Sequence, residues 1–346
     1  MTIRPGCAQH IGSRKEQQDS FAFSHIEDAA LVERAGVLAV VADGMGGLAL
    51  GRESADTAVK AVISVHESSR AENDPVAILQ EAVETANRDV VSMARNAGVA
   101  GDAGSTLAAV IVKNENLYWT SVGDSRIYLC RSGELVQLNS EQNHASDLMR
   151  RVAAGDISRD DALNNPNGAA LTNFIGNPDL TPADASVRPF PLTKGDWLLL
   201  CSDGLFGTLD DDDIRGELYG NPDDACDRLV QKTIACGKPH QDNVSAAILG
   251  YGDAEPLAVK SRMEQAAEVF QPLPPAGKTR KPLVWGLVAV LLLAVVGGAV
   301  FCGWKKCPTG RIQSGATPVA PPVIKMLPCC EGVQKSISST TKPHGK

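Results

Sequence analysis

The chain has 346 residues, of which 43% are hydrophobic and 21% are charged, and these proportions exclude a wholly disordered or fibrous protein. Its formal charge of −8 is unevenly spread: residues 278–346 hold ten Lys or Arg and one Glu, which leaves 23 basic and 40 acidic residues, a net −17, in residues 1–277. So acidic a domain is a poor candidate for nucleic-acid binding, because phosphate backbones attract positive charge.

Short apolar runs and stretches of helical spacing alternate through the first 250 residues. Strands are expected at 20–24, 37–42, 107–112, 116–122, 126–130, 196–202 and 244–249. Helical spacing appears at 53–67, 76–97, 148–154 and 224–235. Residues 114–116 and 131–134 have the composition of hairpin turns. Strands joined in hairpins, with helices grouped between them, favour an α+β fold with largely antiparallel pairing.

The C-terminal part of the chain predicts a membrane anchor. Residues 256–282 are expected to be a linker, and the 22 uncharged residues 283–304 a single transmembrane helix, since about 1.5 Å per residue spans a hydrocarbon core about 30 Å thick. Trp285 and Trp304 lie near its ends, where aromatic rings favour the interface. The N-terminus has no apolar export segment, so residues 1–255 are expected to form a cytoplasmic domain at the inner or plasma membrane. Residues 305–346, basic and rich in Pro, Ser and Thr, are expected to be disordered.

Cysteine and histidine usage argues against a zinc site in the N-terminal domain. Only six His occur, and none pairs with a Cys or another His at ligand spacing. The five cysteines at positions 7, 130, 201, 226 and 236 are therefore expected to be small buried residues in a reducing compartment. The role of the cysteines at 302, 307, 329 and 330 is left open.

Aspartates recur at the ends of the predicted strands. Three apolar runs lead into an Asp next to a Gly, and two further Asp directly precede or nearly precede a strand; the five are Asp19, Asp43, Asp124, Asp203 and Asp242. Gathered in one place, such carboxylates would repel each other unless a cation lay among them. Hard cations such as Mg²⁺, Mn²⁺ and Ca²⁺ prefer oxygen ligands, and Gly44 lets a backbone carbonyl approach an ion. Arg14 has the fork geometry that binds a phosphoryl group.

These motifs resemble those of the metal-dependent serine/threonine protein phosphatase 2C family, specifically its bacterial branch. The matching stretches, in the family's order, are 14–20, 41–51, 104–106, 123–126, 171–176, 201–205 and 241–245. The resemblance implies an α+β fold with an antiparallel β-sandwich flanked by helices on both faces, in αββα layers. It also implies a dinuclear Mg²⁺ or Mn²⁺ centre, at which activated water hydrolyses phosphoserine and phosphothreonine in proteins.

The resemblance further implies roles for individual residues. Asp43 would bridge both ions and act in catalysis, the Gly44 carbonyl would bind one ion, and Asp203 and Asp242 would hold the other. Asp19 would support the site through water-mediated contacts, Asp124 with Asp203 would bind a third ion, and Arg14 would bind the substrate phosphate. Residues 143–170 match a mobile flap. Met45 stands where animal members use a His as general acid, so the general acid is left open.

The sequence thus predicts a membrane-tethered phosphatase of signal transduction, acting on phosphorylated proteins opposite a Ser/Thr kinase pathway. Two alternatives remain. Residues 44–49 also match the dinucleotide fingerprint Gly-x-Gly-x-x-Ala, although Asp43 would then lie beside a pyrophosphate. The single predicted span and basic tail also fit a catalytically weak, phosphatase-like membrane sensor or receptor.

Overall fold

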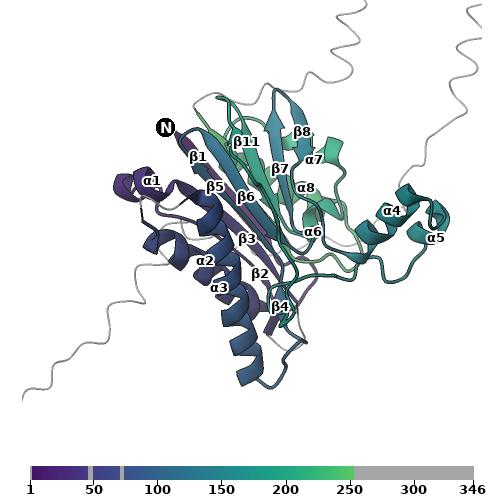
Figure 1. Ribbon diagram of the computed structural model, residues 1–346. Helices are drawn as coiled ribbons and strands as arrows, with labels where there is room; N and C mark the ends of the chain where they lie inside the picture. The colour runs from purple at the N-terminus through teal and green to yellow at the C-terminus, as the bar shows by residue number, and fades with distance from the viewer. Residues whose placement is uncertain (1, 46–49, 71–73, 253–346) are drawn as a thin grey trace, which may run out of the picture. The chain divides into compact units, whose positions relative to one another are not determined.

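The computed structural model of the protein describes residues 2–45, 50–70 and 74–252 (Figure 1). The strands are β1 Ile3–His10, β2 Asp19–Phe23, β3 Val37–Met45, β4 Gly104–Ser105, β5 Leu107–Lys113, β6 Asn116–Val122, β7 Arg126–Arg131, β8 Glu134–Gln137, β9 Asp184–Ala185, β10 Phe190–Pro191, β11 Trp197–Cys201 and β12 Val244–Tyr251. The helices are α1 Ala29–Ala35, α2 Leu50–Ser68, α3 Pro75–Asn96, α4 His144–Ala154, α5 Arg159–Leu163, α6 Asp203–Phe206, α7 Asp211–Glu217 and α8 Pro222–Ala235.

The strands form two antiparallel sheets. The first has the order β1-β12-β11-β7-β8. The second has the order β10-β6-β5-β3-β2, with β9 beside β6 and β4 beside β3. Each of these neighbouring pairs runs antiparallel. The predicted antiparallel α+β class is therefore confirmed.

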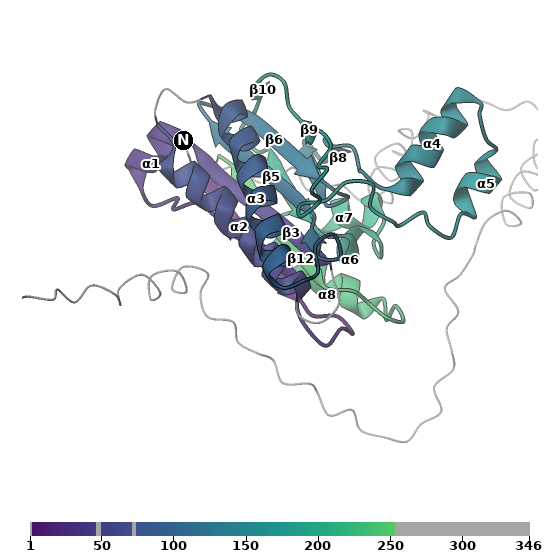
Figure 2. The same cartoon turned by 60° about the horizontal axis from the view of Figure 1, so that its bottom comes forward.

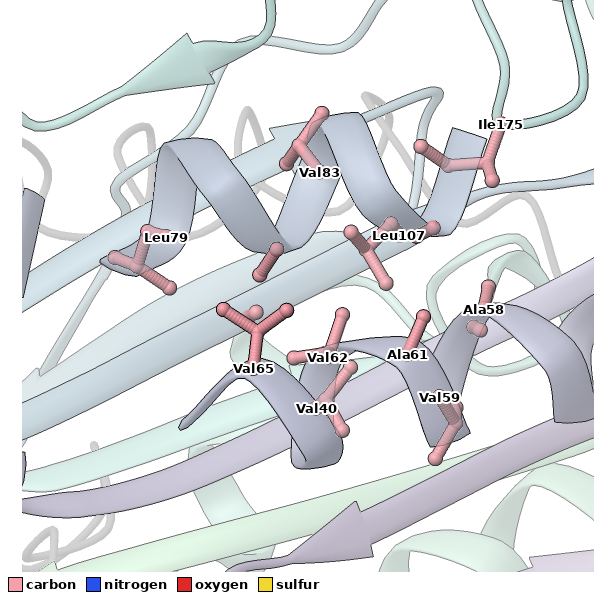
Figure 3. Packing of buried hydrophobic residues seen from close by; sticks show 14 of the residues in the cluster. Val40, Ala58, Val59, Ala61, Val62, Val65, Leu79, Val83, Leu107 and Ile175 are labelled. Atoms are coloured by element: carbon pink, nitrogen blue, oxygen red, sulfur yellow. The ribbon is translucent and has the colours of Figure 1, made fainter. Parts of the chain in front are cut away.

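Three apolar clusters hold the layers together. The central cluster fills the space between the sheets and includes Val110 of β5, Leu198 of β11 and Leu249 of β12. A second cluster joins the outer face of the larger sheet to α2 and α3, and it includes Val40 of β3, Val62 of α2 and Val83 of α3 (Figure 3). The third joins the smaller sheet to α7 and α8. Burial of both faces of both sheets produces the predicted αββα layers.

Both predicted hairpin turns are present. Residues Asn114 and Glu115 connect β5 to β6 with φ of 51° and 63°, and Ser132 and Gly133 connect β7 to β8 with φ of 53° and 79°. Two consecutive positive φ values define the type I′ turn, whose twist matches the strands it joins. Turn chemistry in the sequence was thus sufficient to place these hairpins.

The sequence did not predict β1 or α1. Strand β1 contains Pro5 and few large apolar residues, and it lies at a sheet edge, where it pairs only with β12 among the described strands. An edge strand tolerates Pro and needs little apolar surface, so it lacks the pattern that marks a central strand. The expectation that all five domain cysteines are buried was wrong for Cys236, which is exposed after the end of α8, and Cys7 is only half-buried.

The predicted membrane segment lies outside the described residues, as do the linker and the tail. Within the part of the chain that is described, none of the helices combines the length and apolar character needed to cross a bilayer. The predicted boundaries at 255, 282 and 304 stay predictions.

Candidate active site

The strand ends that carry the five predicted aspartates meet at one end of the sandwich. Asp19 begins β2 and lies directly opposite Asp43 on β3. Cys201 at the end of β11 pairs with Ala246 near the start of β12. The residues just beyond those two positions, Asp203 and Asp242, therefore emerge at the same edge. Antiparallel pairing thus brings the two members of each pair together, and the packing of the two sheets brings the pairs near each other.

The electrostatics of these carboxylates show how close they lie. Burial, followed by the negative charges of Asp19, Asp203, Asp242 and Asp124, holds the pKa of Asp43 well above its usual range. Burial above all, and also the charges of Asp203 and Asp242, raises the pKa of Asp19 to about 6. Burial and the charge of Asp203 raise the pKa of Asp124 to about 7. All five aspartates therefore share one electrostatic site, in which the ionised forms repel each other.

Two buried carboxylate oxygens in this site have no protein donor. Within the described residues, neither Oδ1 of Asp19 nor Oδ1 of Asp203 has a hydrogen-bond partner. A buried charged oxygen without a partner costs free energy, and burial and like charges also raise the pKa of Asp203. A divalent cation would satisfy these oxygens and cancel the repulsion, so the residues present fit a hard-metal site.

The side chains are nevertheless not arranged as a preformed ligand set. Among the described residues, no three or more His, Cys, Asp or Glu side chains form a group that could hold a metal ion as they stand. The oxygens of Asp242 have other partners: Oδ2 accepts from Nη2 of Arg14 at 2.6 Å, and Oδ1 accepts from the N–H of Asn243 at 2.8 Å. The Arg14 and Asp242 side chains are 55% and 37% exposed, so packing does not fix this ion pair.

Hydroxyl groups next to the aspartates hold the main chain of the site in place. The N–H of Asp43 donates to Oγ1 of Thr106 at 2.9 Å, and the Asp43 carbonyl accepts from the N–H of Thr106 at 2.8 Å and from Oγ of Ser105 at 2.9 Å. Ser202 donates its hydroxyl proton to Oδ2 of Asp19 at 2.8 Å. None of these three supporting residues, Ser105, Thr106 and Ser202, was predicted as a site residue, although each lies inside one of the matching stretches.

Asn243 organises the loop that carries Arg14. Its Nδ2 donates to the carbonyls of Ile11 and Glu16 at 2.9 and 3.0 Å, and its Oδ1 accepts from the N–H of Gln18 at 2.7 Å. Three bonds from one buried amide thus clamp both ends of residues 11–18. The clamp explains how an Arg from the start of the chain comes to lie beside Asp242.

Two glycines allow the chain segments of the site to pack closely. A Cβ on Gly44 would lie 1.9 Å from the carbonyl oxygen of Gly51, and one on Gly204 would lie 1.9 Å from that of Asn243. Neither position can hold a side chain without moving the backbone. The predicted role of the Gly44 carbonyl as a metal ligand stays a prediction.

A cleft of about 460 Å³ opens beside the aspartates. One side is formed by residues of the predicted flap, including Asn143 and Gly168, and the other by the turn after Asp203 together with Lys238 and His240. Helices α4 and α5, which make up the flap, project from the sandwich (Figures 1 and 2). A cavity of similar size, about 450 Å³, lies between α3 and residues 180–186, away from the five aspartates. The cleft at the acidic cluster is therefore the candidate site.

Comparison with known proteins points to the same part of the chain. The protein phosphatase 2C family model matches residues 7–245. The serine/threonine phosphatase stp of Listeria welshimeri is 29% identical over 217 residues, which are 61% of this chain and 83% of that protein. The structure of the S. agalactiae serine/threonine phosphatase covers 72% of this chain and all of that one, with 26% identity and a TM-score of 0.63. The catalytic domain of the serine/threonine phosphatase PstP, solved with two manganese ions, covers 72% of this chain and 99% of that one, with 26% identity and a TM-score of 0.55.

Proposed function

The chain belongs to the protein phosphatase 2C family and is a metal-dependent serine/threonine protein phosphatase, and we propose that its active site is the cluster of five aspartates with Arg14. The observation that carries this assignment is the convergence of five mutually repelling carboxylates, two of which, Asp19 and Asp203, each have a buried oxygen without a protein partner among the described residues. The enzyme uses two Mn²⁺ or Mg²⁺ ions, and we propose that Asp124 and Asp203 hold a third.

Each residue of the cluster has a distinct task in this proposal. Asp43, the Gly44 carbonyl, Asp203 and Asp242 hold the two ions, and Asp19 supports them from the neighbouring strand. When bound, the ions lower the pKa of a water that attacks phosphorus and stabilise the charge that develops on the phosphoryl oxygens.

Arg14 orients the substrate in the same proposal. Its guanidinium already lies at the cluster, bonded to Asp242, and its exposure leaves it accessible to a phosphate. A guanidinium binds phosphate oxygens through two parallel hydrogen bonds, which fixes the phosphorus for in-line attack. Lys would supply the charge but not this fork.

An Asp43→Asn variant tests the assignment. We expect hydrolysis of an aryl phosphate and of a phosphopeptide in Mn²⁺ to be abolished, because Asn cannot bridge two cations. Asp89→Asn, on the solvent side of α3, is the matched control and keeps both activities. Full activity of Asp43→Asn would refute the assignment. A wild-type protein that binds Mn²⁺ but turns over neither substrate would instead support the sensor alternative.

We further propose that residues 283–304 anchor the enzyme in the inner or plasma membrane as a single span, with the catalytic domain in the cytoplasm. Support comes from 22 uncharged residues with Trp near both ends and basic residues on both flanks. The full chain should remain with membranes after alkaline extraction, whereas a chain lacking 283–304 should be released. Release of the full chain would contradict the proposal.

Phosphorylated proteins are the proposed substrates in the cell, in a pathway shared with a Ser/Thr kinase. The family and the curated relative named serine/threonine phosphatase support this assignment. A phosphoproteome comparison between cells with the wild-type chain and cells with Asp43→Asn identifies the substrates: their phosphoserine and phosphothreonine sites should accumulate in the variant. An unchanged phosphoproteome would count against the proposal.

A further inference from the structure

Arg126, the first residue of β7, lies at the centre of a polar network beneath the cleft. Its Nε donates to Oε1 of Glu141 at 2.6 Å, and its Nη1 donates to the hydroxyl of Tyr128 at 2.7 Å. Its guanidinium carbon lies 3.9 Å from the centre of the Phe206 ring. The Arg126 and Glu141 side chains are only 23% and 15% exposed. A charged pair this sheltered is held in one geometry, unlike an ion pair on the surface.

The network reaches both walls of the cleft. On the flap side, Oε2 of Glu141 accepts from Nδ2 of Asn143 at 2.8 Å, and Oδ1 of Asn143 caps α4 by accepting from the N–H of Ser146 at 2.9 Å. On the other side, Phe206 ends α6, the helix that begins at Asp203. Asn143 and Phe206 both line the cleft. Arg126 thus contacts one wall directly and the other through Glu141.

We propose that Arg126 is a positioning residue that fixes the two walls of the cleft relative to each other, and so controls the binding of the polypeptide on either side of a phosphorylated residue. This inference rests on the proposed function of the site. A small aryl phosphate needs the metal ions and Arg14, whereas a phosphopeptide is long enough to contact the walls. Removal of Arg126 leaves a nearly buried Glu141 carboxylate without its cation, so the first turn of α4 has to shift.

The chain contains a matched control for the loss of such an arginine. Arg131, at the other end of β7, donates from Nε and Nη2 to the buried carboxylate of Asp196 at 2.9 and 2.6 Å. Its guanidinium carbon lies 5.2 Å from the centre of the Phe190 ring. The arrangement resembles that of Arg126, but none of these three residues lines the cleft among the residues described. Its removal should lower stability without altering the walls.

The test compares Arg126→Gln and Arg131→Gln in the full chain with Mn²⁺. We expect Arg126→Gln to lower kcat/KM for a phosphopeptide about tenfold more than kcat/KM for an aryl phosphate, mainly through KM. Arg131→Gln should lower the thermal midpoint and keep the ratio of the two kcat/KM values at the wild-type level. Equal losses on both substrates in Arg126→Gln, or the same split in Arg131→Gln, would overturn the inference. A wild-type enzyme inactive on both substrates would instead overturn the proposed function.

A double-mutant cycle separates positioning from a general loss of stability. If Arg126 acts through Glu141 on Asn143, the double variant will raise the phosphopeptide KM by less than the product of the fold-changes in the single variants Arg126→Gln and Asn143→Ala. Multiplicative effects would show that the two residues act independently and would overturn the inference. Should Arg126→Gln not fold, Arg126→Lys keeps the charge but not the forked geometry of the guanidinium. It should lower kcat/KM for the phosphopeptide more than for the aryl phosphate, by a smaller factor than Arg126→Gln. Equal losses on the two substrates in Arg126→Lys would overturn the inference.

Discussion

The free-energy cost of keeping the aspartate cluster without its cations can be measured at Asp19. This side chain is 1% exposed, and burial together with the charges of Asp203 and Asp242 raises its pKa from 3.8 to about 6. The folded protein therefore binds the Asp19 proton more tightly than the unfolded chain does. The stability that the protonated Asp19 carboxyl contributes is fully present below pH 3.8 and is lost as the pH rises through about 6. At 1.36 kcal/mol per pKa unit, the ionised carboxylate costs about 3 kcal/mol at pH 7.5 and about 0.5 kcal/mol at pH 4.

An Asp19→Asn variant removes this charge at nearly constant shape. In the metal-free protein we expect the variant to be about 3 kcal/mol more stable than wild type at pH 7.5, and about 0.5 kcal/mol more stable at pH 4. Urea unfolding in excess chelator, followed by tryptophan fluorescence, to which the buried Trp197 contributes, measures both free energies. Asp89→Asn should match wild type at both pH values. With saturating Mn²⁺ the order should reverse, because the ions stabilise only the charged cluster fully.

Either of two results would refute this reasoning. One is an Asp19→Asn variant no more stable than wild type at pH 7.5 without metal, which would mean that burial and the neighbouring charges do not raise the pKa of Asp19. The other is a stability difference of the same size at pH 4, which would mean that the effect is one of packing and not of charge.

Three further predictions follow from the same site and core. Gly204→Ala should lose several kcal/mol of stability and most of its Mn²⁺ affinity, since the added Cβ would lie 1.9 Å from the Asn243 carbonyl oxygen. Gly216→Ala in α7 should instead gain up to ~1 kcal/mol, because the added Cβ would meet no described atom within 4 Å apart from its chain neighbours and the nearby backbone of its own helix. Equal thermal midpoints for the two variants would contradict this. Arg14→Ala should raise KM for an aryl phosphate about tenfold or more, because the substrate phosphate loses its guanidinium partner. It should change the free energy of unfolding by less than about 1 kcal/mol, because the ion pair of Arg14 with Asp242 is exposed. An unchanged KM would show that Arg14 does not bind the substrate. Leu200→Ala, in the core between the sheets, should lower the free energy of unfolding measured in urea by about 2–5 kcal/mol without changing KM. A loss below about 1 kcal/mol would show that this layer is loosely packed.

Much of the fold could be predicted from the sequence, because central strands and hairpins are marked by local patterns of residues. The run 116–122 coincides with β6, since each of its ends is marked by a turn. Strand β1 could not be predicted in this way, because an edge strand buries little apolar surface and can accommodate a proline such as Pro5. Likewise α4 begins at His144, four residues before the predicted start, because the Asn143 side chain caps it and not because of apolar spacing. Capping and edge pairing depend on individual hydrogen bonds, which periodicity does not reveal.

By itself, the sequence determined which chemical groups the site contains, because strand-terminal aspartates, a flexible Gly44 and a forked Arg14 are properties of residue type and order. Only the tertiary structure decided that Asp19 lies opposite Asp43, that their charges repel in a buried place, and that Arg126 joins the two walls of the cleft. Proximity, desolvation and shared hydrogen bonds arise from segments that meet in space after folding, so no local pattern in the chain encodes them.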